Sequence, residues 1–105
     1  MELKIYWTAF SKTELRKIFD YYKENANITI AKKQILEIES KTTILKTHPS
    51  VGQQEELLKD REQEFRYLVL KNYKIIYWIN HKENLVVISD IFDTRQNPTK
   101  IQKVK

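Results

Sequence analysis

Apolar and polar residues alternate at the start of the chain. Within residues 2–8, one side of the pattern carries Leu3, Ile5 and Trp7, and the other carries Lys4, Tyr6 and Thr8. A repeat of two residues is the period of a strand with one buried face. We therefore expect residues 2–8 to form an edge or half-buried strand.

Three more strands are expected between residues 64 and 98. The apolar and aromatic run 65–70 ends at the two-residue break Lys71-Asn72, and asparagine tolerates the positive φ that tight hairpin turns need. A second run, 73–79, is rich in isoleucine, tyrosine and tryptophan. A β-branched run, 85–92, follows the polar loop 80–84. Such runs between polar turns are typical of strands.

A hairpin tip at residues 71 and 72 fixes which residues face each other across the first two of these strands. Residue 70 then faces 73, 69 faces 74, 67 faces 76 and 65 faces 78. One face of the hairpin carries Phe65, Tyr67, Val69, Lys74, Ile76 and Trp78, and the other carries Arg66, Leu68, Leu70, Tyr73, Ile75, Tyr77 and Ile79. Because both faces are largely apolar, we expect the hairpin to be central in its sheet and covered on both sides.

Two helices are expected between the first strand and this hairpin. Ser11-Lys12-Thr13-Glu14 has the pattern of a capping box, and apolar residues at 15, 18, 19 and 22 give one buried face to a helix that ends near Asn25. A second helix, 28–47, has an apolar stripe at 28, 31, 35, 38, 42 and 45. This stripe favours an intramolecular helical hairpin packed on a sheet over a coiled-coil dimer.

The expected order is therefore β-α-α-β-β-β, an α+β fold with a helical hairpin packed on a mostly antiparallel four-stranded sheet. Pro49 and Gly52 mark a turn after the second helix, and the polar stretch 53–63 is expected to be a short helical turn or an anchored loop. Residues 1–105 are expected to form a single domain. Its short basic C-terminal tail, about 98–105, is expected to be mobile unless a partner orders it.

Composition narrows the classes of function. The 105 residues include no cysteine, which excludes disulfides and thiol catalysis, and the two histidines, His48 and His81, are far apart. We expect no metal and no cofactor. No apolar run approaches the roughly 20 residues of a membrane span, and the first residues lack a signal-peptide pattern, so a cytoplasmic protein without membrane contact is expected. The net charge of +5 favours anionic partners such as nucleic acid, the ribosome or an acidic protein segment.

The candidate functional residues are cationic and aromatic. Lys74 lies on the same expected face as Tyr67 and Trp78, where a lysine beside aromatic rings is suited to stacking a nucleic-acid base. The alternative is a solvated lysine lying over aromatic residues that serve only packing. Arg66 lies on the opposite face, where we expect it to pair with a carboxylate of a helix.

Arg95 follows the last strand directly. Its guanidinium is suited to clamping a phosphate or a carboxylate with two hydrogen bonds. The alternative is an ion pair with Asp93 or Asp90 that closes the end of the strand.

The chain resembles the RelE/ParE superfamily of toxins from type II toxin–antitoxin modules, whose members include many plasmid stabilisation proteins. The resemblance covers nearly the whole chain and rests on the order and spacing of several pieces. These are Trp7-Thr8, Tyr21-Tyr22, the series Leu45, Pro49 and Gly52, and the runs FRYLV at 65–69, NYKIIY at 72–77 and FDTRQNP at 92–98. It implies a bacterial, growth-arresting toxin held inactive by a cognate antitoxin.

Two mechanisms occur in this superfamily, and the fold does not choose between them. RelE-like members cut messenger RNA in the ribosomal A site, and ParE-like members inhibit DNA gyrase. In the RelE-like reading, Lys74 and Arg95 match catalytic positions. However, Tyr67 and Val69 stand where that branch has basic residues, and no Tyr or His follows Arg95. The residues therefore favour a toxin that acts by binding a protein target.

Two alternatives stay open: a metal-independent messenger RNA endonuclease and a non-toxic antitoxin-binding module. In the binding reading, the candidate contact residues are Tyr67, Trp78, Arg66, Lys100 and Lys103. The resemblance implies a cognate antitoxin as partner, and the net charge predicts that its binding segment is acidic and amphipathic. We expect this segment to cover apolar surface on the sheet and the helical hairpin. No small-molecule substrate is expected.

Overall fold

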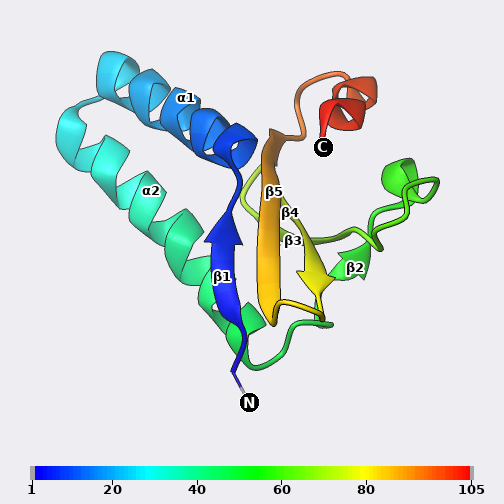
Figure 1. Cartoon of the computed structure of the whole chain (residues 1–105). Helices are drawn as coiled ribbons and strands as arrows, with labels where there is room; N and C mark the ends of the chain where they lie inside the picture. Colours follow the sequence, from blue (N-terminus) through cyan, green and yellow to red (C-terminus); the bar gives the residue numbers. More distant parts are fainter. Residues whose placement is uncertain (1, 105) are drawn as a thin grey trace.

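The computed structural model describes residues 2–104 and has a helical hairpin on one side of a five-stranded sheet (Figure 1). The elements, in chain order, are β1 (Lys4–Trp7), α1 (Ala9–Asn25), α2 (Ile28–Thr42), β2 (Gln53–Gln54), β3 (Arg66–Leu70), β4 (Tyr73–Asn80) and β5 (Leu85–Asp93), with the 3₁₀ turns η1 (Thr43–Lys46), η2 (Glu56–Leu58) and η3 (Pro98–Lys103). The predicted α+β class and helical hairpin are confirmed.

The strands lie in the order β1-β5-β4-β3-β2. Strand β1 is an edge strand and runs parallel to β5, whereas the other neighbours are antiparallel. The expected four-stranded sheet therefore has a fifth strand. This strand, β2, consists of two residues of the polar stretch that we expected to be a helical turn or loop, because Gln53 and Gln54 pair with the start of β3.

The register of the β3–β4 hairpin is the predicted one. Leu70 pairs with Tyr73 and Val69 with Lys74, and the pairing continues to the far end of β3. The turn itself differs, because the positive φ of 55° belongs to Lys71 and not to Asn72. Lys71 is also anchored by its ammonium group, which forms an ion pair of 2.9 Å with Glu37 of α2.

Helix α1 begins earlier than the sequence indicated. Its N-cap is Thr8, whose extended backbone (φ −67°, ψ 161°) continues β1, and whose Oγ1 accepts a hydrogen bond from the Ser11 N–H at 3.1 Å. Ser11 is therefore inside the first turn and fully buried, so the predicted capping box at Ser11 is wrong. The predicted end at Asn25 is confirmed, whereas α2 ends at Thr42 and continues only as the tighter turn η1.

The apolar stripes of both helices pack on one face of the sheet. Ile18 of α1, Ile38 of α2 and Leu45 of η1 form one buried cluster with residues of β4 and β5, namely Tyr73, Ile75, Tyr77, Val86, Ile88 and Ile91. Ile28, at the start of the predicted stripe, is 47% exposed and lies outside this cluster. Among the described residues, no helix combines the length and the apolar character needed to cross a membrane.

The opposite face of the sheet is covered by η2 and by the C-terminal segment 98–104. Ile101 and Val104 are buried in a second cluster with Leu58, Phe65, Ile76 and Phe92. The Arg61 guanidinium donates hydrogen bonds to the carbonyls of Val104 and Gln102, the latter at 2.6 Å. The expectation of a mobile tail is therefore wrong for the described residues, because two apolar side chains complete a core that the strands leave open.

A close approach at the turn before β2 explains the single glycine of the chain. The Tyr77 hydroxyl donates to the Pro49 carbonyl at 2.6 Å and accepts from the Gly52 N–H at 3.0 Å. A Cβ on Gly52 would lie 2.5 Å from the Tyr77 hydroxyl oxygen and 2.8 Å from the carbonyl oxygen of Tyr67. No larger residue fits there, because the second contact is with backbone.

We expect Gly52→Ala to lower the free energy of unfolding by about 1–3 kcal/mol, the usual effect of overpacking a core. Tyr77→Phe should cost about 1–3 kcal/mol, because the buried Gly52 N–H loses its acceptor. Tyr6→Phe, at a side chain that is 52% exposed, is the matched control and should change stability by less than about 0.5 kcal/mol. Urea unfolding measures all three, and a Gly52→Ala variant as stable as the wild type would refute this account of the turn.

Candidate functional site

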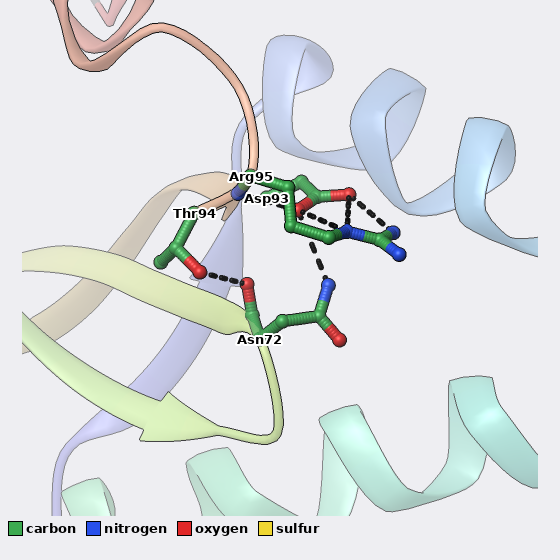
Figure 2. A network of polar contacts seen from close by, with 4 residues as sticks. All are labelled: Asn72, Asp93, Thr94 and Arg95. Atoms are coloured by element: carbon green, nitrogen blue, oxygen red, sulfur yellow. Dashed lines mark hydrogen bonds and ion pairs between the residues drawn. The ribbon is translucent and has the colours of Figure 1, made fainter.

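Arg95 lies where the β3–β4 turn meets the end of β5, in a network of polar side chains (Figure 2). Its Nε and Nη2 donate to the Asp93 carboxylate at 3.0 and 2.7 Å. The same carboxylate accepts from Asn72 Nδ2 at 3.2 Å. Thr94 completes the network, because its N–H and its hydroxyl both donate to the Asn72 carbonyl at 2.8 Å.

The ion pair between Arg95 and Asp93 shifts the pKa of both side chains. Hydrogen bonds from the Arg95 side chain lower the pKa of Asp93 to about 2, and the carboxylate in turn raises the pKa of Arg95. Of the two roles considered for Arg95, the structure therefore agrees with the ion pair: Arg95 binds Asp93 at the end of β5. Its side chain remains 62% exposed, but the charge already has a counter-ion.

Lys74 is paired as well, on the opposite face of the sheet. Its Nζ lies 2.9 Å from Glu55 Oε2 and 4.3 Å from the centre of the Tyr67 ring. Glu55 is only 3% exposed, and it also accepts from the Leu57 N–H at the start of η2. The sequence singled out the lysine and missed its partner, because Glu55 is one of several acids in a polar stretch.

The structure does not bring Lys74 and Arg95 together. Lys74 lies beside Phe92 on the face covered by η2 and the C-terminal segment. Arg95 instead lines a small cavity with Tyr21 of α1 and Tyr73, on the face covered by the helical hairpin. The sheet separates the two cations, so they do not form one phosphate clamp.

The other aromatic and cationic candidates divide between two places. Tyr67 donates its hydroxyl hydrogen to the Gln53 side chain at 2.9 Å. Trp78 and Arg66 line a cavity of about 460 Å³ together with His81. The predicted pairing of Arg66 with a helix carboxylate is wrong. Its guanidinium donates to the Glu64 carboxylate at 2.8 Å and to carbonyls of the turn before β2, because β2 brings that turn beside β3.

Lys100 and Lys103 lie on η3, with exposed side chains. Both line a cavity of about 190 Å³ between α1 and the C-terminal segment, where Lys17 also contributes. In the part of the chain that the structure describes, neither forms an ion pair with a carboxylate. These two lysines are therefore available to an anionic partner, whereas Lys74 and Arg95 are each already paired with a carboxylate.

Sequence reasoning missed a shallow groove along the outer side of α2. Leu36 of α2, which is 62% exposed, and Leu70 of β3 form its apolar floor. The groove has a volume of about 820 Å³, and its rim carries Lys32, Lys33 and Lys41. The only sequence signal was an isoleucine- and leucine-rich helix with one apolar residue, Leu36, off the buried stripe. An apolar floor with a basic rim is suited to an acidic amphipathic segment.

Residues 2–104 contain no group of three histidine, cysteine, aspartate or glutamate side chains positioned to hold a metal ion.

Comparisons with known proteins place these features in a family context. A family model described as the ParE toxin of type II toxin–antitoxin systems, parDE, matches residues 5–98. No curated protein sequence matches the chain. Among solved structures, a chain of the chromosomal ParDE toxin–antitoxin system from P. aeruginosa superposes with a TM-score of 0.72 and 17% sequence identity, covering 88% of this chain and 96% of that chain. At this identity the likeness shows a shared fold.

We expect the Lys74–Glu55 pair to stabilise the fold rather than to be a free cation site. Glu55→Gln should lower the free energy of unfolding by about 2–4 kcal/mol, because a largely buried lysine loses its counter-ion. Glu56→Gln, at the exposed neighbouring position, should change it by less than about 0.5 kcal/mol. Replacing both partners, as Glu55→Gln with Lys74→Met, should recover part of the loss. Unchanged stability of Glu55→Gln in urea unfolding would contradict this assignment.

Proposed function

The chain belongs to the ParE family of toxins from type II toxin–antitoxin systems, and we propose on that premise that it arrests growth by binding and inhibiting a protein target such as DNA gyrase. The family assignment agrees with the resemblance drawn from the residues. The antitoxin is the partner that such a system implies. Beyond the family assignment, we propose both the arrest of growth and the kind of target.

The proposal rests on the two cations that a nuclease would need, Lys74 and Arg95. Each is paired with a carboxylate, and the sheet lies between them. Cleavage of RNA without a metal requires several positive side chains around one phosphate, together with an acid and a base. Lys74 and Arg95 lie on opposite faces of the sheet, and each is bound to a carboxylate at 2.9 and 2.7 Å. A protein that acts by binding needs no such cluster.

The candidate contact residues for the target are those that remain accessible. Lys100 and Lys103 have exposed side chains on η3. Trp78 and Arg66 line the cavity of about 460 Å³ described above. We propose that the positive η3 surface contacts an anionic region of the target. The ribosome-dependent nuclease remains the second candidate, favoured only by the match of Lys74 and Arg95 to catalytic positions of the RelE-like branch.

Inducible expression in a susceptible bacterium tests the mechanism. We expect DNA synthesis to fall before protein synthesis in pulse labelling, with transcripts left intact. We also expect Lys74→Met and Arg95→Ala, wherever they fold, to keep toxicity within about tenfold, whereas Lys100→Glu with Lys103→Glu should reduce it further. Inhibition of supercoiling by purified gyrase is the direct readout.

New cuts inside translated codons, lost in Lys74→Met and Arg95→Ala, would instead establish the nuclease. Normal growth with folded, abundant protein would favour a non-toxic antitoxin-binding module. The double variant Lys32→Glu with Lys33→Glu is the matched surface control. It changes the net charge by the same amount, but on α2 and away from η3.

We further propose that the antitoxin neutralises the toxin through an acidic amphipathic segment in the groove of α2. Its apolar side chains would cover Leu36 and Leu70, and its carboxylates would pair with Lys32, Lys33 and Lys41. The net charge of +5 supports a partner of opposite sign.

Leu36→Glu should weaken antitoxin binding at least tenfold, about 1.4 kcal/mol, in isothermal calorimetry, because a charge replaces the apolar floor of the groove. Leu57→Glu is the matched control, since Leu57 is also exposed, at 43%, but lies on η2, away from α2. Equal losses in the two variants, or a loss confined to the control, would place the antitoxin elsewhere.

A further inference from the structure

A carboxyl group without a charged partner lies in the cavity between α1 and the C-terminal segment 98–104. Asp90 of β5 is 3% exposed, and it lies just beyond Ile88, where the pairing of β5 with β1 ends. Among residues 2–104, no side chain forms an ion pair with the Asp90 carboxyl or donates a hydrogen bond to it. Because buried carboxyl groups normally have such a partner, this one is available to accept hydrogen bonds from a ligand.

The cavity, about 190 Å³, is acidic at its base and basic at its rim. Asp90 is buried, whereas Lys100 and Lys103 of η3 line the same cavity with exposed side chains. The other charged residues of the lining, Glu14 and Lys17 of α1, bind each other at 3.2 Å. The charges that remain for a ligand are therefore one buried carboxyl group and two exposed ammonium groups.

This arrangement selects a ligand whose two ends differ in charge. A simple anion gains nothing from the carboxyl group, and a simple cation is repelled by the lysines. The matching ligand has neutral N–H donors at one end and an anionic group at the other. Phe10 and Phe92 also line the cavity, and aromatic side chains favour a planar ring.

A guanine nucleotide has each of these features. Its ring carries two adjacent N–H donors, N1–H and the amino group at position 2, which can bind the two oxygens of one carboxylate. The ring is planar, and the phosphate pairs with ammonium groups. Pockets that enclose a whole small ligand measure about 300–1,000 Å³, so this smaller cavity holds the ring and leaves the ribose and phosphate at the rim.

We propose that the cavity is a guanine-nucleotide site. Asp90 binds the N1–H and the amino group of the base, Phe10 and Phe92 contact the ring, and Lys100 and Lys103 bind the phosphate. Adenine and cytosine present one amino group beside a ring acceptor, and that acceptor faces the carboxylate unfavourably. Because the two lysines are also the proposed contacts of the target, nucleotide and target would compete for them.

The protonation state of Asp90 sets the conditions for a test. Burial raises the pKa of Asp90 to about 7, and the charge of Glu14 adds to the rise, whereas the Ile91 amide and Lys17 lower it. The guanine donors bind the ionised carboxylate. Binding is therefore measured at about pH 8, where most of the carboxyl groups are ionised.

Isothermal calorimetry of the full chain with a series of nucleotides tests the site without gyrase, so its result does not depend on the proposed target. We expect guanosine monophosphate (GMP) to bind with a Kd below about 1 mM. Inosine monophosphate lacks the amino group at position 2, and guanosine lacks the phosphate, so each should bind at least about tenfold more weakly. No saturable binding of GMP, or equal affinities for the three compounds, would overturn the proposal.

Asp90→Asn tests the role of the carboxyl group by a change of specificity. The amide side chain offers one acceptor and one donor, which match the N1–H and the position-2 carbonyl of xanthosine monophosphate. We expect this variant to lose at least about tenfold in affinity for GMP and to gain affinity for xanthosine monophosphate. A purely structural role of Asp90 would give no such gain. Asp60→Asn, an exposed aspartate after η2, is the control.

The lysines are tested by Lys100→Glu with Lys103→Glu. This double variant should weaken GMP at least about tenfold and leave guanosine unchanged, because only GMP carries the phosphate. Lys23→Glu with Lys82→Glu is the matched control, since both lysines are exposed and neither lines the cavity. NMR titration of the wild type with GMP should shift the amides of Ile91 and Gln96, which line the cavity. Shifts confined to other surfaces would overturn the proposal without any variant.

Discussion

The fold depends on one strand that is apolar on both faces. Tyr73, Ile75 and Tyr77 of β4 point to the helical hairpin, and Ile76 points the other way, and all four are buried. A strand of this kind is stable only if two separate layers cover it. The helices supply one layer. The other comes from η2 and the C-terminal segment, which is why a short polar stretch and a basic tail become ordered parts of the molecule (Figure 1).

The same need for cover explains how the charges are arranged. One segment that packs over β4 brings a carboxylate that pairs with a cation of the sheet, and a second ion pair closes the end of β5. Glu55 arrives with η2 and binds Lys74, and Asp93 at the end of β5 binds Arg95. Among the described residues, the lysines without an ion pair include those of η3 and those along the outer side of α2. A surface of this kind is suited to recognition of an anionic partner and poorly suited to holding a phosphate in a reactive geometry.

Asp90 is the exception to this pairing. Asp90 is 3% exposed and lies just beyond the point where β1 stops pairing with β5, and the nearby Lys17 is bound to Glu14. A buried group without a counter-ion makes the surrounding structure sensitive to its protonation.

The sequence by itself determined the order of elements, the two faces of the hairpin and the register of β3 and β4, because these follow from side-chain period and a two-residue turn. It also determined the family, through residues spread along the chain. Only the tertiary structure decided that Glu55 neutralises Lys74, that Lys74 and Arg95 are separated, and that the tail is buried through Ile101. These features join residues distant in the chain, and local patterns carry no information about which distant charge or apolar surface a segment will meet.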